Sequence, residues 1–397
     1  MSAEPARVVH LITRLDVGGA QETAVRICAG LDRQRFAPEL WCGPDEGSGG
    51  SLRQVAEAAG VPVVEIGHLH GPIRPWADAA AVREVRARLA ADRPAILQTH
   101  SSKAGVIGRK AVPRGSGTRV VHTVHGWSFN DSQLAPVAAG YRLIERFLAP
   151  RTDALVVVTT ADRDTGLAHH IGTPEQYVVI RSGIDLDEAA GAIARDAERK
   201  ALGWKPDDVV VASVGRLEAQ KDPLTMVSAL AAARRRVPQL RLALVGGGSL
   251  EGEVRTRAAS LGVTDRLDLL GLRDDVPAVL DASDLFALSS RWEGLPRAAL
   301  EATRAGLPIA ATDTGGIREL IDDGVTGRLV PVGDAVALGA ALVDLVEDPE
   351  RARRLASAAA ERLPSFTAEQ MVADTEALYD RLLARPSAPP TRGATSP

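Results

Sequence analysis

The chain alternates short strand-forming runs with helix-forming segments along most of its length, and this alternation restricts the fold more than any other feature. The strand-forming runs are mainly Val, Ile, Leu and Ala, as expected for parallel strands that are buried on both faces. Between them, apolar residues recur at helical spacing, for example Ala20, Ala24, Ile27 and Leu31. Such an alternation predicts an α/β fold with parallel sheets.

The strand-forming runs fall into two series. The first comprises residues 7–13, 61–66, 95–99, 119–124 and 153–159, and the second comprises residues 208–214, 240–246, 266–271, 284–289 and 307–312. The charged, alanine-rich stretch from Asp185 to Pro206 separates them, which is typical of a connection between domains. A chain of 397 residues is also long enough for two domains, each with its own core. We therefore expect two Rossmann-like domains.

Composition excludes several classes of partner and site. The formal net charge of -4 and the aromatic content of 3% give neither a basic field nor stacking platforms for nucleic acid. The two cysteines, Cys28 and Cys42, belong to no metal-binding motif, so we expect no metal site and a reduced, cytoplasmic compartment. Because the first residues do not resemble a signal peptide and no apolar run reaches bilayer length, any membrane contact is expected to be peripheral.

Glycine-rich turns follow several of the expected strands. Gly18 and Gly19 come after the first one and precede a helix, whose free amides suit an anion. A tight turn with no ligand explains the same pair equally well. The dinucleotide pattern GxGxxG is absent from this turn and from LVGGGSL at 244–250, which argues against a nicotinamide oxidoreductase.

Two cations flank the turn SVGRLEAQKD at 213–222, where a strand ends at Gly215. Arg216 and Lys221 together can clamp a diphosphate, although either residue alone is more often a surface charge. The first domain has no Asp-x-Asp pair after a strand, so a metal that bridges the diphosphate is not required. Fixed cations can neutralise a leaving phosphate instead.

Two glutamates lie in the segment SSRWEGLPRAALEATRAG, which begins where the strand at 284–289 ends. Glu293 falls in a turn next to Gly294, and Glu301 falls about one turn into the following helix. This arrangement lets one carboxylate meet a sugar and the other accept hydrogen bonds from ribose, with the helix N-terminus directed at phosphate. Two surface glutamates are the alternative interpretation.

These segments together resemble the retaining glycosyltransferases of family four, which have the GT-B fold of two Rossmann-like domains facing across a deep cleft. The resemblance covers the chain to about residue 383. It is carried by GRLEAQKD, LVGGG, GLRDDVP, SRWEGLPRAALEA and ATDTGGIREL, in the family's order. The sequence RSGID at 181–185 departs from the family's Asn-Gly-Ile-Asp at Ser182, which we expect to alter a turn rather than the reaction.

The resemblance implies a role for each matching residue. Arg216 and Lys221 would hold the donor diphosphate, Glu301 the ribose, and the backbone around Arg273 the base. Glu293 would face the donor sugar and, with His125, Arg216 and Lys221, form the catalytic set. The full donor set is Gly18, Gly19, Arg216, Lys221, Arg273, Gly294, Leu295, Arg297 and Glu301.

Histidines mark the strand ends of the first domain. His125 follows a strand and precedes Gly126, which favours a ligand contact over a structural role, and it matches the family's histidine near the donor sugar. His122 lies within the strand and is expected to be packed. His100 and Lys103, in THSSKAG, and Gln21, in GGAQE, are expected near the acceptor, and the role of Glu22 is left open.

The resemblance also implies domain roles and chemistry. We expect an acceptor domain at 1–185, a connection at 186–206, a donor domain at 207–364, a C-terminal helix at 365–384 that packs back on the first domain, and a disordered tail at 385–397. The co-substrate would be a nucleoside-diphosphate sugar, with no cofactor and no metal. The acceptor would be a hydroxyl, with a lipid-linked glycan precursor as the leading hypothesis and peripheral contact with the inner face of the membrane.

The reaction implied is sugar transfer with retention, in which the acceptor attacks on the face that the diphosphate leaves. Double displacement through a carboxylate nucleophile is the mechanistic alternative. The alternative functions are a GT-B sugar-nucleotide epimerase, a sugar phosphorylase and a catalytically silent nucleotide-sugar-binding protein. The nucleotide base, the sugar, the acceptor and the oligomeric state are not specified by the sequence.

Overall fold

We analysed a computed structural model of the chain, which describes residues 4–45, 51–130, 133–187 and 195–385. The chain divides into two compact units. The first comprises residues 1–183 together with 368–397, and the second comprises residues 184–367. The expected tail at 385–397 lies outside the described residues except for Arg385. No helix in the described part of the chain is long and apolar enough to cross a membrane.

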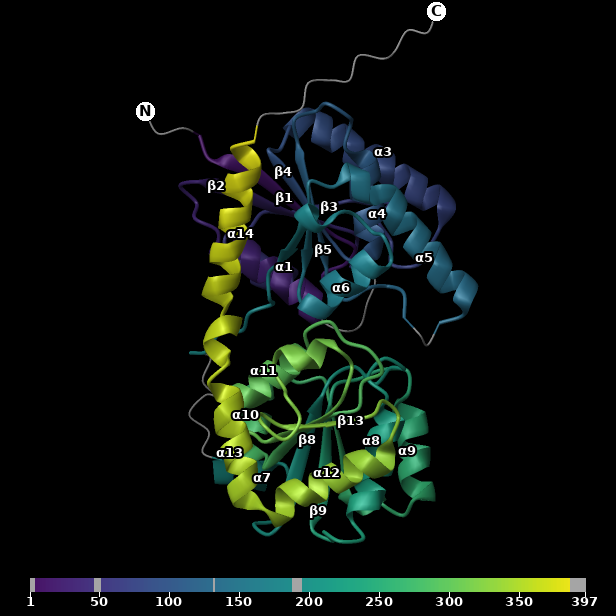
Figure 1. The fold of residues 1–397 in the computed structure, drawn as a ribbon, viewed down its shortest axis with the longest axis vertical. Helices are drawn as coiled ribbons and strands as arrows, with labels where there is room; N and C mark the ends of the chain where they lie inside the picture. The colour runs from purple at the N-terminus through teal and green to yellow at the C-terminus, as the bar shows by residue number, and fades with distance from the viewer. Residues whose placement is uncertain (1–3, 46–50, 131–132, 188–194, 386–397) are drawn as a thin grey trace, which may run out of the picture. The chain divides into compact units, whose positions relative to one another are not determined.

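The first unit contains a seven-stranded parallel sheet in the order β3-β2-β1-β4-β5-β6-β7 (Figure 1). Its strands are β1 (Ala6–Ile12), β2 (Phe36–Cys42), β3 (Val63–Glu65), β4 (Ile96–His100), β5 (Arg119–Val124), β6 (Ala154–Val157) and β7 (Tyr177–Val179). Its helices are α1 (Gly19–Gly30), α2 (Arg53–Ala58), α3 (Pro75–Asp92), α4 (Ser102–Ala111), α5 (Ala135–Leu148), α6 (Thr160–Ala168) and α14 (Ala368–Leu383).

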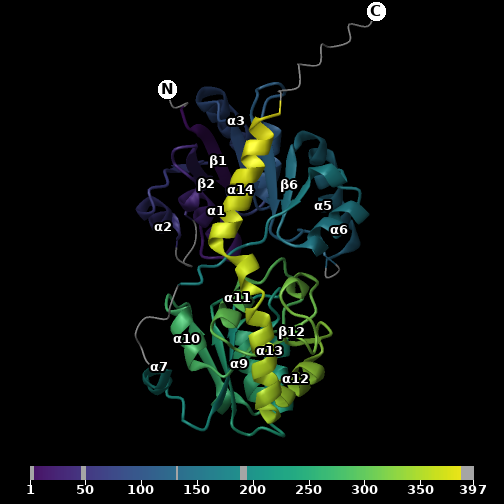
Figure 2. The same ribbon diagram turned by 60° about the vertical axis from the view of Figure 1, so that its left-hand side comes forward.

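Helices cover both faces of this sheet. On one face, α1 and α14 pack side by side (Figure 2). Tyr379 of α14 is buried there in one cluster with Val8 and Ile96 of the sheet. On the other face, α3 and α4 bury residues such as Val85 and Ile107 against the sheet. The C-terminal helix is therefore part of the first unit's core, although almost two hundred residues separate it from the rest of that unit.

The second unit contains a six-stranded parallel sheet in the order β10-β9-β8-β11-β12-β13. Its strands are β8 (Val209–Val214), β9 (Leu240–Val245), β10 (Leu267–Gly271), β11 (Leu285–Leu288), β12 (Ile309–Thr312) and β13 (Arg328–Val330). Its helices are α7 (Arg195–Ala201), α8 (Pro223–Ala233), α9 (Glu251–Ser260), α10 (Val276–Ala282), α11 (Arg297–Arg304), α12 (Ala335–Glu347) and α13 (Pro349–Ala360). Short 3-10 helices in the chain are Ala149–Arg151, Pro174–Gln176, Thr264–Arg266, Gly316–Glu319 and Leu363–Phe366.

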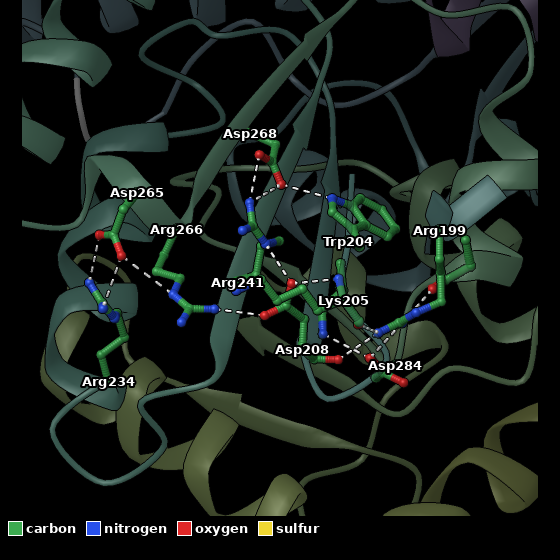
Figure 3. A network of polar contacts seen from close by, with 12 residues as sticks. Arg199, Trp204, Lys205, Asp208, Arg234, Arg241, Asp265, Arg266, Asp268 and Asp284 are labelled. Atoms are coloured by element: carbon green, nitrogen blue, oxygen red, sulfur yellow. Dashed lines mark hydrogen bonds and ion pairs between the residues drawn. The ribbon is translucent and has the colours of Figure 1, made fainter. Parts of the chain in front are cut away.

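A buried ionic network ties α7 to the amino ends of the second unit's strands (Figure 3). The Arg199 guanidinium donates to Asp284 and to the carbonyl oxygens of Ala282, Lys205 and Asp208. Trp204 is also buried, in one cluster with Val210 and Val279. The expected connection at 186–206 is therefore too long, since its described residues from 195 onward are packed into the second unit.

Both sheets change their direction of winding at one point. In the first unit this point lies between β1 and β4, and in the second between β8 and β11. Ligands of open parallel sheets bind beyond the carboxyl ends of the strands at such switch points. The turns at Gly18 and His100 flank the first switch point, and the turns at Arg216 and Glu293 flank the second.

Candidate functional site

In the second unit, the loop after β8 carries both predicted diphosphate cations. Arg216 is exposed and its Nη2 lies 3.4 Å from Gln220 Oε1. Lys221 lies at the end of the loop, just before Asp222, which caps α8 from a left-handed conformation with φ of 46°. Arg216, Lys221 and Ser289 line one small cavity beside Gly215. The structure thus places the two cations at one concave spot on the carboxyl edge.

Lys221 also connects this loop to the loop after β11. Its Nζ lies 2.5 Å from Glu293 Oε1, and the Ser290 hydroxyl donates to the same oxygen over 2.6 Å. Glu293 is nearly buried, with 8% of its side chain exposed, and Lys221 is 22% exposed. The two predicted catalytic groups are therefore in direct contact.

Close backbone contacts hold the neighbouring strand-ending loops together. A Cβ on Gly246 would lie 2.2 Å from the Gly215 carbonyl oxygen, and a Cβ on Gly316 would lie 1.7 Å from the Gly294 carbonyl oxygen. Only glycine permits these approaches. The loops after β8, β9, β11 and β12 therefore form one continuous rim, which the glycine-rich motifs of the sequence build.

The helix α11 begins on this rim. Gly294, Leu295 and Arg297 are buried at its start, and no side chain from the described part of the chain caps its first turn. Arg297 Nη2 lies 3.6 Å from Glu301 Oε1, one turn further along the helix. Glu301 is half-buried, so its carboxylate retains exposed surface on the helix that follows Glu293.

Arg273 forms ion pairs with two acidic residues. Its Nη2 lies 2.9 Å from Glu198 of α7, and its Nε donates to Asp275 over 2.6 Å. The hydrogen bonds that Arg273 donates to Asp275 raise the pKa of Arg273, and burial acts in the opposite direction. The guanidinium is thus paired with two carboxylates of the second unit.

In the first unit, the glycine turn forms the start of α1. Gly18 precedes the helix and Gly19 is its first residue. A Cβ on Gly18 would lie 2.9 Å from the Gln21 amide oxygen, so Gln21 folds back over the turn. Glu22 lies in the first helical turn, and its backbone amide donates to the Gly18 carbonyl oxygen. Gln21 and Glu22 are both half-buried.

Three histidines of the first unit form a row of nearly parallel rings that are joined through their ring nitrogens. His10 Nδ1 lies 2.9 Å from His100 Nε2, and His100 Nδ1 lies 3.0 Å from His125 Nε2. The ring centroids are 5.2 and 5.3 Å apart. His10 and His100 have no exposed surface, whereas His125 is half-buried. His100, which was expected near the acceptor, therefore has no surface of its own for a ligand.

Two further residues lie near this row. His122 is buried, and its Nδ1 lies 2.9 Å from the Thr99 hydroxyl, so the packed role expected for it is confirmed. Lys103, expected near the acceptor, forms an ion pair of 2.7 Å with Asp78 of α3. Its charge is thus already compensated within the first unit.

The site residues predicted from the sequence do not include His10 or Tyr379. Tyr379 Oη lies 3.0 Å from His10 Nε2 and donates to Gln98 Oε1 over 2.5 Å. One signal was available for the strand residues: Gln98 and His100 share one face of β4, and such polar residues need partners when a parallel sheet is buried on both faces. The partner on α14 is 369 positions from His10, which no local pattern reveals.

Comparisons with known proteins match both units to glycosyltransferase families. Residues 17–188 match the family model Glycosyltransferase Family 4, and residues 194–362 match Glycosyl transferases group 1. The D-inositol 3-phosphate glycosyltransferase of Salinispora arenicola is 31% identical over 328 residues, which is 77% of this chain and 72% of the relative. An Escherichia coli protein, UDP-Gal:alpha-D-GlcNAc-diphosphoundecaprenol alpha-1,3-galactosyltransferase, is 35% identical over 64% of this chain and 66% of its own length.

Solved structures show the same fold. The Anabaena protein HepE in complex with UDP and glucose superimposes with a TM-score of 0.81 at 23% identity, covering 94% of this chain and 100% of that one. WaaG, a glycosyltransferase involved in lipopolysaccharide biosynthesis, has a TM-score of 0.74 at 17% identity and covers 96% of this chain and 100% of that one. The chain therefore belongs to the family 4 glycosyltransferases and has the GT-B fold of two Rossmann-like domains.

Proposed function

We propose that this glycosyltransferase moves a hexosyl or N-acetylhexosaminyl group from a uridine-diphosphate sugar to a hydroxyl acceptor, with retention and without a divalent metal. The contact between Lys221 and Glu293 on the carboxyl edge of the second unit carries the proposal. A uridine donor is favoured because one relative is named for UDP-Gal and one structural neighbour was solved with UDP and glucose.

The charges of the rim suit a departing diphosphate. Arg216 and Lys221 place two cations beside the small cavity at Gly215, and the start of α11 contributes backbone amides nearby. These groups stabilise negative charge where it develops, without needing a metal ion to bridge the phosphates. We assign the donor diphosphate to this place.

Glu293 would then serve the sugar. Its carboxylate is fixed by Lys221 and Ser290, so it is oriented before a ligand binds. A fixed negative charge near the anomeric carbon stabilises the positive charge that forms there as the diphosphate leaves. In retaining transfer of this kind the leaving phosphate accepts the acceptor's proton, and the protein needs no further nucleophile.

We further propose a lipid-linked acceptor reached at an anionic membrane surface through α5. The buried side of this helix is fixed by an ion pair of 2.8 Å between Arg109 and Glu145. Its other side exposes apolar side chains at helical spacing: Val137 (47%), Leu143 (66%), Ile144 (41%) and Phe147 (61%), with Leu134 (77%) just before the helix.

Arginine side chains lie near this apolar face. The Arg151 guanidinium lies 5.5 Å from the centre of the Phe147 ring, and Arg142 and Arg146 belong to the same helix. An amphipathic helix with apolar and basic residues together lies in the interface of an anionic bilayer. The E. coli relative is named for a substrate linked to diphosphoundecaprenol, and this name agrees with a lipid-linked acceptor.

The donor assignment is tested by thermal shift with UDP, GDP, ADP and TDP, followed by transfer assays with the UDP-sugars. A nucleotide that binds only the folded chain raises its melting temperature. We expect the largest shift with UDP, and sugar transfer that persists in EDTA. A shift confined to GDP would reassign the base, and activity lost in EDTA and restored by Mn²⁺ would overturn metal independence.

A further inference from the structure

The row of histidines in the first unit runs diagonally across the sheet to its carboxyl edge. His10 of β1 is in register with Gln98 of β4, two residues before His100. His100 is in register with Thr123 of β5, two residues before His125. Each step therefore advances two residues along the strands and stays on the sheet face that α14 covers, since alternate residues of a strand share a face.

The start of the row has a defined hydrogen-bond direction. The Gln98 amide nitrogen donates to the Thr123 hydroxyl over 2.8 Å, which leaves the amide oxygen for Tyr379. Because a phenol has one proton, and Tyr379 donates it to Gln98 Oε1, its oxygen can only accept from His10 Nε2. His10 therefore carries its proton on Nε2.

The hydrogen bonds between the three histidines all have the same donor-to-acceptor direction. Burial lowers the pKa of His10 to about 3 and that of His125 to about 4, and it also lowers the pKa of His100, so the three rings are neutral at pH 7. A neutral imidazole has one donor and one acceptor nitrogen. His10 Nδ1 must then accept from His100 Nε2, and His100 Nδ1 must accept from His125 Nε2.

We propose that Tyr379 and Gln98 are positioning residues that fix His125, through His10 and His100, as the tautomer with its proton on Nε2 and a bare Nδ1. His125 would then meet a substrate as a hydrogen-bond acceptor. The opposite direction requires the Gln98 amide to turn over, so that its nitrogen donates to Tyr379 and His125 presents an Nδ1 proton.

This inference rests on the proposed function only for its consequence in catalysis. A bare Nδ1 accepts a hydrogen bond from a sugar or acceptor hydroxyl and orients that hydroxyl, whereas an Nδ1 proton would donate to a ring or phosphate oxygen instead. The C-terminal helix thus contributes to the site without touching a ligand, because Tyr379 has no exposed surface.

The tautomers can be read directly from the full chain labelled with 15N-histidine, using long-range proton–nitrogen correlation at pH 7. The His125 signals are assigned by their loss in His125→Gln. We expect His10, His100 and His125 to be neutral with the proton on Nε2. A His125 that carries its proton on Nδ1, or a cationic His125, would overturn the inference.

Tyr379→Phe removes the oxygen that accepts from His10 and keeps the ring that packs on Phe36. We expect His125 to lose its single tautomer and kcat/KM to fall about tenfold, the equivalent of one hydrogen bond. Gln98→Leu should act in the same way. The matched control is Tyr177→Phe, which removes a hydroxyl that donates to the Ile171 carbonyl oxygen and should leave the tautomer of His125 unchanged.

The outcomes separate the two proposals. If Tyr379→Phe folds and keeps both the His125 tautomer and the rate, Tyr379 is not a positioning residue. If the wild-type tautomers are as expected but no UDP-sugar is transferred, the row of hydrogen bonds stands and the proposed function fails. A rate loss in Tyr379→Phe with an unchanged tautomer would assign the loss to packing and overturn the inference.

Discussion

Lys221 and Glu293 form an ion pair across two strand-ending loops, with 2.5 Å between Nζ and Oε1. The pair joins the end of the loop after β8 to the loop after β11, on the two sides of the switch point of the second sheet. A diphosphate that binds Lys221 must share it with Glu293. Under the proposed function, donor binding and the orientation of the Glu293 carboxylate would therefore be coupled through one ammonium group.

Glu293→Gln and Glu301→Gln should change different kinetic constants. We assign Glu293 to the positive charge that develops in the transition state, so we expect Glu293→Gln to lower kcat about a hundredfold. Glu301 is assigned to the ribose, which is bound equally before and during reaction, so Glu301→Gln should raise the donor KM about tenfold with little change in kcat. Kinetics with varied donor and saturating acceptor measure both constants.

The control for these variants is Glu347→Gln. Glu347 is the last residue of α12 and forms an ion pair of 2.5 Å with Arg236, and it belongs to none of the loops that form the rim. Glu347→Gln should leave both constants unchanged. If Glu301→Gln instead lowers kcat and Glu293→Gln affects KM alone, the two roles must be exchanged.

Arg216→Ala tests the diphosphate assignment. The side chain is exposed and contacts Gln220 only at 3.4 Å, so its removal should leave the melting temperature unchanged. Loss of a charge-assisted contact to the leaving group should cost about 3 kcal/mol, or roughly a hundredfold in kcat/KM. Arg255→Ala, another exposed arginine of the second unit, should have no effect on kcat/KM. Equal rates for wild type and Arg216→Ala would remove Arg216 from the site.

The fold and the rim of the second unit were largely predictable from the sequence. All ten strands expected from apolar runs occur, and the carboxyl ends of parallel strands bring Arg216, Lys221 and Glu293 to one edge. The strand β2 was missed because Pro38 interrupts it and has no amide proton to donate. The strands β7 and β13 have three residues each and give too short a pattern.

The remaining residues were not predicted because their hydrogen-bond partners lie far away in the sequence. Arg199 was read as part of a charged connection, but its guanidinium is buried, and carbonyl oxygens from two separate segments accept from it, one at Ala282 and the other at Lys205 and Asp208. The row at His10 likewise depends on Tyr379, which α14 brings back to the first sheet from the far end of the chain. Sequence patterns describe one element at a time and do not specify which elements become neighbours.

Acidification should destabilise the first unit. Burial lowers the pKa of His10 to about 3, whereas a histidine in an unfolded chain has a pKa of about 6.5. The unfolded state therefore binds more protons in this range, and the stability present above pH 6.5 is lost as the pH falls toward 3. Each such histidine lowers the free energy of unfolding by about 1.4 kcal/mol per pH unit.

Urea unfolding between pH 7 and pH 5 measures this dependence. Histidines at 100, 122 and 125 also have lowered pKa values, and Arg109 contributes to the shift at His122, so the total slope should exceed that of one group. His10→Gln should reduce the slope by one proton. The control Val8→Ala creates a cavity on the same strand face and should lower stability equally at both pH values. A wild-type stability that does not fall by pH 5 would contradict the prediction.

Asp208→Asn should destabilise the second unit. The Asp208 side chain is 2% exposed and lies 3.2 Å from Arg241 and 2.7 Å from Arg266. Although burial acts to raise it, the pKa of Asp208 is lowered, by the Lys205 amide and the two guanidiniums. Breaking this buried pairing should cost about 3 kcal/mol. Asp265→Asn, at an exposed pair with Arg234, should cost less than about 1 kcal/mol in the same unfolding measurement.

The apolar face of α5 should bind anionic vesicles. Leu143 and Phe147 are mostly exposed, so replacing both with Ser removes apolar surface without disturbing the buried pair of Arg109 and Glu145. We expect the wild type to cosediment with vesicles of phosphatidylglycerol and phosphatidylcholine. The double variant should lose about a hundredfold in partition, since burial of each of the two side chains contributes about 1.5 kcal/mol or more. The matched control is Val55→Ser, at an exposed apolar residue of α2. Equal partition of the wild type and the double variant, or binding that does not depend on anionic lipid, would show that α5 is not the membrane contact.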